Sequence, residues 1–190
     1  MTEEDRGAMG EEEEITTAAV DLDPEVARLI EMLGLAPHPE GGFFRETWRS
    51  PLVLSGLPQG APRSASTAIY FLLPAGSFSA LHRVGSDEVW HHYDGDPVEL
   101  HVLEGRVHQT FVLGRDLAQG QRPQHVVPAG AWQAAVPLGA RWSLCGCTVA
   151  PGFDFDDFEM PSREEMLRLL PDHVGIVKRL TRAPEAISSG

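Results

Sequence analysis

Short apolar runs separated by glycine and proline turns constrain the fold of this chain more than any other feature of its sequence. Between residues 43 and 149, nine runs of three to eight residues are either apolar or alternate between apolar and polar side chains. Such runs are typical of β-strands and are too short for most helices. The 19 glycines and 15 prolines supply turns between them. The pattern predicts a β-sandwich or a closed barrel. The predicted strands are 43–50, 66–73, 79–84, 88–92, 98–103, 106–113, 125–127, 133–136 and 142–149.

Helical signals flank the predicted strands on both sides. Asp23 is a suitable N-cap, and Gly34 can adopt the left-handed conformation that ends a helix. Near the C-terminus, Ser162 and Glu165 have the spacing of a capping box. We therefore expect a β-structure with helical flanks, the helices spanning residues 21–35, 162–170 and 173–180.

The net charge of −13 narrows the choice of partners. An acidic surface repels phosphate backbones and anionic lipids, so we expect no nucleic acid and no membrane partner. No apolar stretch approaches the roughly 18–20 residues of a membrane span, and no signal-peptide pattern opens the chain. These observations indicate a soluble, cytoplasmic protein that acts on a small molecule.

The chain length suits one domain. Seven acidic residues fall within the first 20 positions, which predicts a disordered acidic tail over residues 1–20. We expect a single domain over residues 21–183 and a flexible C-terminal tail over residues 184–190. The two cysteines, Cys145 and Cys147, would point to the same face of a strand, which is unfavourable for a disulfide. We interpret them as buried thiols.

Two spaced motifs stand out: the first contains Gly76, His82, Val84, Glu88 and Gly95, and the second contains Pro128, Gly130 and Gln133. They resemble the two motifs of the cupin superfamily. In that family the first motif supplies two histidines and a glutamate, the second supplies another histidine, and together they hold a divalent metal inside a small barrel. Here His82 and Glu88 are retained, whereas Val84 stands for the second histidine and Gln133 for the third.

The resemblance extends beyond the two motifs to segments 38–42, 68–73, 86–91, 95–97, 120–124, 127–133 and 146–153. Through these segments the chain resembles the DUF985 branch of the cupins over roughly residues 25–160. The resemblance implies an all-β double-stranded β-helix, the cupin or jelly-roll barrel, with flanking N- and C-terminal helices. It also implies a homodimer. It leaves the activity open.

A metal site would have to use His82, Glu88 and Gln133. A catalytic zinc or iron site normally uses imidazole and carboxylate ligands, and the loss of two imidazoles weakens such a site. We therefore expect no cofactor, with a divalent metal on these three residues as the alternative. The other interpretation is that His82 and Glu88 simply hydrogen-bond to each other inside the barrel.

Proton-transfer chemistry fits the retained residues better. His82 would be the base and Glu88 its acid or orienting partner, because burial and pairing can bring such groups near neutrality. Tyr70 or His92 would be a second proton donor. Strict alternation from Glu88 puts His92 on its face and His91 on the other, whereas a bulge would exchange the two.

Further residues are candidates for substrate binding. Trp90 and Trp132 adjoin the two motifs and could stack on a ring or sugar face, although buried tryptophans more often fill a core. Alternation puts Arg45, Thr47 and Arg49 on one strand face, from which Arg45 could clamp an anionic group or form a surface ion pair. Gln133 and one of the histidines, His91, complete the set. The acidic stretch 154–159 alternates with phenylalanines, which predicts an edge strand with an acidic outer face.

The sequence therefore favours a metal-independent enzyme of the isomerase, epimerase, cyclase or lyase type that acts on an oxygenated or sugar-like substrate. A non-catalytic sensor or carrier is one alternative. A metal-dependent cupin enzyme that uses His82, Glu88 and Gln133 is the other.

Overall fold

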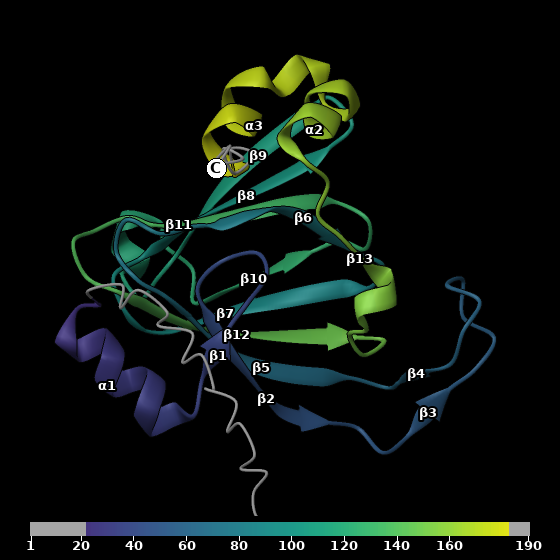
Figure 1. The fold of residues 1–190 in the computed structure, drawn as a ribbon, viewed down its shortest axis with the longest axis horizontal. Coiled ribbons are helices and arrows are strands. Elements are labelled where there is room, and N and C mark those ends of the chain that lie inside the picture. Colours follow the sequence, from purple (N-terminus) through teal and green to yellow (C-terminus); the bar gives the residue numbers. More distant parts are fainter. Residues whose placement is uncertain (1–21, 183–190) are drawn as a thin grey trace, which may run out of the picture.

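The computed structural model describes residues 22–182, so the tails predicted over residues 1–20 and 184–190 lie outside it. Two antiparallel sheets face each other, as the two layers in Figure 1 show. This is the architecture expected from the glycine- and proline-punctuated runs and from the cupin resemblance. None of the helices within these residues has the length and apolar character that crossing a membrane requires.

The six-stranded sheet has the order β1-β2-β5-β12-β7-β10, and the five-stranded sheet has the order β13-β6-β11-β8-β9. Strands β3 and β4 form a separate hairpin beyond the ends of β2 and β5 (Figure 1). In the first sheet the strands are β1 (Ala36–Pro37), β2 (Phe43–Arg49), β5 (Thr67–Leu73), β12 (Ser143–Ala150), β7 (Asp87–Gly95) and β10 (Gln124–Val127). In the second they are β13 (Phe158–Glu159), β6 (Ser79–Val84), β11 (Trp132–Pro137), β8 (Val98–Glu104) and β9 (Val107–Leu113). The hairpin consists of β3 (Val53–Leu54) and β4 (Arg63–Ser64).

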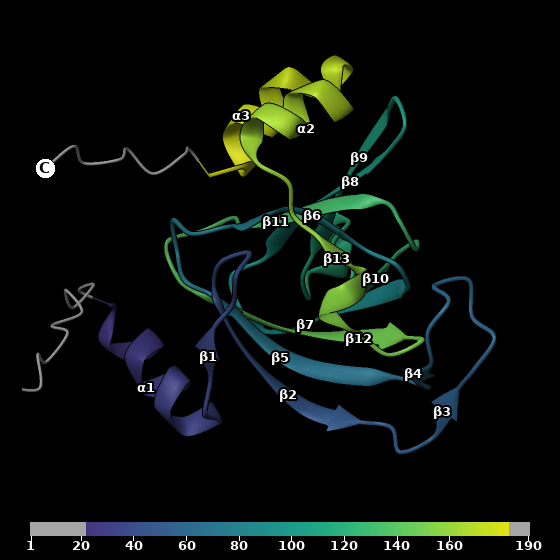
Figure 2. The ribbon, with the colours of Figure 1, turned by 45° about the vertical axis from the view of Figure 1, so that its right-hand side comes forward.

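The core is divided by the five-stranded sheet. Between the two sheets, Phe71, Trp90 and Val102 belong to one buried cluster that also contains both cysteine side chains. On the outer face of the five-stranded sheet, Trp132 and Met166 belong to a second cluster beneath the C-terminal helices (Figure 2). Because side chains alternate along each strand, successive residues of β11 pack into different clusters.

The predicted helices are present with the predicted caps. The side chain of Asp23 accepts hydrogen bonds at the start of α1 (Pro24–Leu33), and Gly34 ends this helix with φ +60°. The capping box between Ser162 and Glu165 opens α2 (Arg163–Leu169). The third helix, α3 (Val174–Leu180), follows the 3-10 turn η3 (Pro171–His173), and a further 3-10 turn, η1, spans Leu117–Gln119. Local capping chemistry was therefore a reliable guide to these helix ends.

A β-bulge in β2 changes the face that the end of this strand presents. Glu46 pairs with Ile69 and Trp48 with Ala68, so Thr47 is an extra residue without a partner in β5. Strict alternation predicts that Arg45, Thr47 and Arg49 share one face. That prediction was wrong for Arg49, because the bulge turns its side chain to the inner face of the sheet.

The acidic stretch after β12 is also different from the prediction. Residues 154–159 do not form one edge strand: a 3-10 turn, η2 (Phe155–Asp157), precedes the two-residue strand β13. The side chain of Asp154 accepts a hydrogen bond from the backbone N–H of Asp156, which stabilises the turn. As a result, phenylalanines of this segment cover the inner face of the barrel.

Candidate functional site

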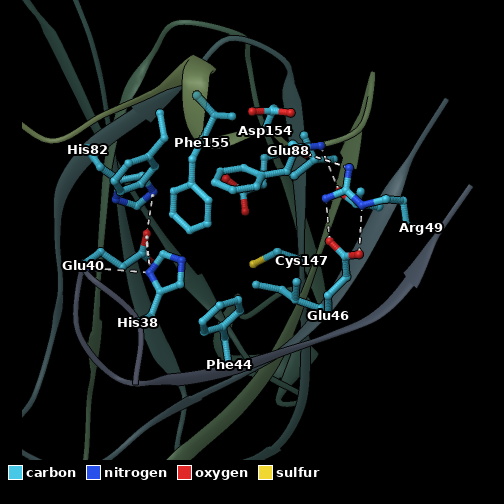
Figure 3. A pocket seen from close by; sticks show the side chains of 16 residues that line it. His38, Glu40, Phe44, Glu46, Arg49, His82, Glu88, Cys147, Asp154 and Phe155 are labelled. Carbon is cyan, nitrogen blue, oxygen red and sulfur yellow. Dashed lines mark hydrogen bonds and ion pairs between the residues drawn. The ribbon is translucent and has the colours of Figure 1, made fainter. Parts of the chain in front are cut away.

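A cavity of about 200 Å³ lies between the two sheets. A cavity of this size suits a small ligand. Polar side chains surround the space in Figure 3, and phenylalanines complete its wall. The lining residues are His38, Glu40, Phe44, Glu46, Arg49, Thr67, Ile69, His82, Val84, Glu88, Cys147, Val149, Phe153, Asp154, Phe155 and Phe158.

The turn between β1 and β2 brings His38 and Glu40 into this cavity. Two glycines follow, Gly41 with φ +114° and Gly42 with φ +67°. A Cβ atom on Gly42 would lie 2.6 Å from the carbonyl oxygen of Leu72, so only glycine fits there. The tight turn therefore fixes where the two preceding side chains point.

The carboxyl group of Glu40 lies between two imidazoles. Its Oε2 is 3.3 Å from Nε2 of His82 and 3.4 Å from Nδ1 of His38. Ser79 donates a hydrogen bond to the other oxygen, Oε1, at 2.9 Å. Glu40 and His82 are only 6% and 2% exposed, so water does not compete for these contacts. Residues from both sheets thus form one buried polar group, which Figure 3 shows on one side of the cavity.

Hydrogen-bond directions assign the protons of this group. Nδ1 of His82 lies 2.7 Å from the carbonyl oxygen of Ala80, which can only accept, so this nitrogen carries a proton. Neutral His82 therefore presents a lone pair on Nε2 to Glu40. The backbone N–H of Glu40 donates to Nδ1 of His38, so neutral His38 carries its proton on Nε2. No hydrogen bond of the described residues engages that Nε2, and its ring faces the cavity (Figure 3).

Burial keeps this group uncharged near neutral pH. Desolvation raises the pKa of Glu40 to about 8, partly opposed by the hydrogen bond from Ser79. Desolvation, helped by the nearby His82, lowers the pKa of His38 to about 4. Burial also lowers the pKa of His82, although the charge of Glu88 acts in the opposite direction. The carboxyl of Glu40 is thus a proton donor held between two neutral imidazoles.

Glu88 belongs to a second hydrogen-bonded chain. Gln133 donates from Nε2 to Oε2 of Glu88 at 2.5 Å, and its own Oε1 accepts from the indole N–H of Trp90 at 2.9 Å. All three side chains are buried. Burial raises the pKa of Glu88, opposed by His82 and by the hydrogen bond from Gln133. Burial likewise raises the pKa of the neighbouring Cys147 thiol.

The predicted metal-ligand set does not fit this geometry. An indole N–H can only donate, so the amide oxygen of Gln133 must face Trp90 and its NH₂ group must face Glu88. A donor group at that position cannot coordinate a cation. Within residues 22–182, no three His, Cys, Asp or Glu side chains are grouped in a way that would hold a metal ion. Among the three predicted ligands, only Glu88 keeps lone pairs available toward the cavity, because Ala80 and Glu40 engage both ring nitrogens of His82.

An ion pair stands at the mouth of the cavity. Arg49 donates to both carboxylate oxygens of Glu46, at 2.9 and 2.7 Å, and to the carbonyl oxygen of Phe153. The bulge at Thr47 is what brings Arg49 to this position. The arginine therefore links β2 to the phenylalanine segment that covers the cavity.

Four predicted site residues lie on the outer face of the six-stranded sheet, away from the cavity. Arg45 lies over the ring of Tyr70 at 5.7 Å, and Thr47 donates to the carbonyl oxygen of Ala68. His91 contacts Thr148 at 3.2 Å. None of the four lines the cavity. Tyr70 is therefore not placed to give a proton to a ligand there, since its strand presents Thr67 and Ile69 inward.

Three more predicted residues point inward or are buried without reaching the cavity. His92 does share the face of Glu88, as strict alternation predicts, but its Nε2 binds the carbonyl oxygen of Asp96 near the end of β7. Trp90 lies beneath the cavity, against Phe71 and Gln133. Trp132 faces the C-terminal helices, with Arg83 over its ring at 4.6 Å. Of the predicted catalytic residues, the structure brings only His82 and Glu88 together.

The sequence reasoning missed His38, Glu40 and Arg49. A usable signal existed for the first two: the run His-Pro-Glu stands directly before a Gly-Gly pair that demands a fixed turn. That segment entered the sequence analysis only as part of the family resemblance, because nothing local indicates that it folds against His82. The inward position of Arg49 has no comparable signal, since it depends on the bulge.

Comparisons with known proteins agree with this architecture. A family model described as "Cupin superfamily (DUF985)" matches residues 27–161. The uncharacterized protein YML079W of Saccharomyces cerevisiae is 32% identical in an alignment of 161 residues that covers 75% of this chain and 78% of that protein. A hypothetical protein from Leishmania major has a TM-score of 0.78 at 34% identity, covering 83% of this chain and 98% of that one. Protein SO0799 from Shewanella oneidensis has a TM-score of 0.74 at 38% identity, covering 82% and 96%.

Proposed function

Because this chain belongs to the DUF985 family of the cupin superfamily, we propose that it is a small-molecule enzyme that moves protons on an oxygenated substrate held between its sheets. The reaction class is an isomerisation, an epimerisation or a related step that passes through an enol. The substrate portion that enters the cavity is uncharged, because the neutral imidazoles of His38 and His82 offer no counter-charge to an anion.

One observation carries this proposal: the Glu40 carboxyl lies between His38 and His82 beside a small cavity. In the first step, ionised Glu88 takes a proton from a carbon next to a carbonyl group. Nε2–H of His38 protonates the carbonyl oxygen, and Glu40 replaces that proton through Nδ1. An enol results, and the reverse transfers at the same or the neighbouring carbon give the product.

The roles differ from the ones expected from the motif alone. His82 was expected to be the base, but both of its ring nitrogens have partners, in Ala80 and Glu40. We therefore assign His82 to positioning Glu40 and place His38 in contact with substrate. Glu88 was expected to be the acid or orienting partner of His82, and we assign it the role of base instead.

Proton exchange with solvent tests the proposal whatever the product of the reaction is. Small 2-hydroxy aldehydes, 2-hydroxy ketones and free sugars are incubated with the protein in D₂O, and loss of the proton next to the carbonyl is followed by NMR. We expect exchange with at least one compound and its loss in His38→Gln. His125→Gln is the matched control, since His125 stacks on Phe111 outside the cavity.

Two results would contradict the proposal. One is exchange that persists unchanged in His38→Gln. The other is a panel compound that shifts the NMR signals of the cavity residues but exchanges no proton. The second result would favour the alternative function, a non-catalytic small-molecule-binding protein.

A further inference from the structure

The tryptophan beneath the cavity has a specific hydrogen-bonding role. Trp90 is 1% exposed and donates its indole N–H to Oε1 of Gln133, whose Nε2 then donates to Oε2 of Glu88. A phenylalanine would fill much of the same space but could not donate. The presence of an indole therefore calls for an explanation beyond packing.

The chain of donors has only one possible direction. Indole nitrogen cannot accept a hydrogen bond, so Gln133 must turn its oxygen to Trp90 and its NH₂ group to Glu88. Without the indole, the amide could rotate and offer its oxygen to Glu88 instead. The two orientations favour opposite states of the carboxyl: an N–H donor stabilises the carboxylate, and an oxygen acceptor stabilises the acid.

We propose that Trp90 is a positioning residue that, through Gln133, stabilises the ionised form of Glu88. The proposal deepens the proposed function, because Glu88 must ionise in order to act as a base. It concerns the ligand-free protein, however, and can fail or hold whatever reaction the cavity performs.

Other groups around Glu88 do not replace this effect. His82 from β6 counteracts the rise in the pKa of Glu88 that burial causes. Glu40 from the β1–β2 turn adds to that rise. Cys147 from β12 is a weak thiol donor to the same carboxyl. Val84 and Val149 line the cavity without polar atoms in their side chains. Among the described residues, Gln133 is the strongest neutral donor in contact with this carboxyl.

Infrared titration of the carboxylic-acid C=O band measures the ionisation directly. The band of Glu88 is identified as the one that disappears in Glu88→Gln. In Trp90→Phe we expect the pKa of Glu88 to rise by about one to two pH units, the effect of losing one hydrogen bond to an ionised carboxylate. Gln133→Leu should raise it similarly. The double variant should match Gln133→Leu alone, because both changes break the same chain.

Trp132→Phe is the matched control. Trp132 is also buried and lies directly before Gln133 on β11, but it faces the helices. Its replacement should lower stability and leave the titration of Glu88 unchanged. The proposal is overturned if Trp90→Phe leaves the pKa of Glu88 unchanged, or if Trp132→Phe shifts that pKa equally. It is also overturned if the pKa shifts of Trp90→Phe and Gln133→Leu add in the double variant. If Trp90→Phe folds poorly, Gln133→Leu and Gln133→Glu are compared instead. The first removes the donor to Glu88, and the second replaces the amide with a carboxyl group.

Discussion

Oε2 of Glu40 lies 3.3 Å from Nε2 of His82, although one residue belongs to a turn beside the six-stranded sheet and the other to a strand of the five-stranded sheet. The contact closes one side of the cavity and excludes water from both groups. Burial favours the neutral form of both groups, since it raises the pKa of Glu40 and lowers that of His82. The stability of the fold is therefore coupled to pH at this contact.

The first prediction concerns this pH coupling. Because the pKa of Glu40 rises to about 8 on folding, the folded state holds a proton that the unfolded state has lost above about pH 4.5. The stability that neutral Glu40 contributes is fully present below its pKa of about 4.5 in the unfolded state, and it is lost as the pH rises through 8. Below pH 6.5 the lowered pKa of His38 has the opposite effect on stability, because there the unfolded state binds the extra proton and stability rises with pH. The free energy of unfolding should thus fall between pH 6.5 and 8, at up to about 1.4 kcal/mol per pH unit for each proton.

Denaturant titrations across that window check the slope. Glu40→Gln should flatten it, whereas Glu31→Gln, at an exposed helix position, should keep the wild-type slope. Equal slopes for the wild type and Glu40→Gln would show that Glu40 is already ionised in the folded protein.

The second prediction concerns the turn that carries His38 and Glu40. In Gly42→Ala the new Cβ would meet the carbonyl oxygen of Leu72 at 2.6 Å, and φ is +67°. We expect a loss of at least about 2 kcal/mol, from backbone strain and the clash together. Gly76→Ala is the control: its φ is +74°, but nothing lies within 4 Å, so only about 1 kcal/mol of strain is expected. Equal losses for the two variants in urea titrations would contradict the role assigned to close packing of this turn.

The third prediction restores a metal site. Val84 lines the cavity, and Gln133 touches Glu88, so histidines at both positions would join His82 and Glu88 around one point. Three or four such ligands suffice for zinc. We expect Val84→His/Gln133→His to bind close to one zinc ion per chain, measured by elemental analysis after dialysis. Val84→His alone, which keeps the amide donor of Gln133, is the control and should bind far less.

Zinc binding at the same level in the control would mean that Gln133 does not block coordination. No gain in the double variant would mean that these side chains do not converge as their positions indicate.

The fourth prediction separates the helical cover from the cavity. Met166 on α2 is fully buried against the outer face of the five-stranded sheet. Met166→Ala should cost about 2–5 kcal/mol because it leaves a void, as chemical denaturation would show. Met32→Ala, at a 63% exposed position, should cost far less. Infrared titration of Glu88 should be unchanged in both variants, and a shift in Met166→Ala would show that the helices do influence the cavity.

Much of the architecture was predictable because it depends on neighbouring residues. The strands around Phe71 and Trp90 follow from apolar runs and turns, and the helix ends follow from Asp23 and the Ser162–Glu165 capping box. Strict alternation of strand side chains places Trp90 and His92 on the face of Glu88, whereas the inward direction of His82 and Glu88 was implied by the cupin resemblance. All of these signals act over a few residues and are unaffected by the rest of the fold.

Sequence alone therefore determined the strands, the helix caps and the fact that residues two positions apart on a strand, such as Glu88 and Trp90, share a face, since short-range backbone geometry decides these. Only the tertiary structure decided the composition of the cavity. It folded His38 and Glu40 against a strand about forty positions away, moved Arg49 inward through one unpaired residue, and turned the amide of Gln133 toward Glu88 by means of Trp90. Such contacts join distant segments, and a single extra residue in a strand exchanges its faces, so their outcome depends on packing that no local pattern encodes.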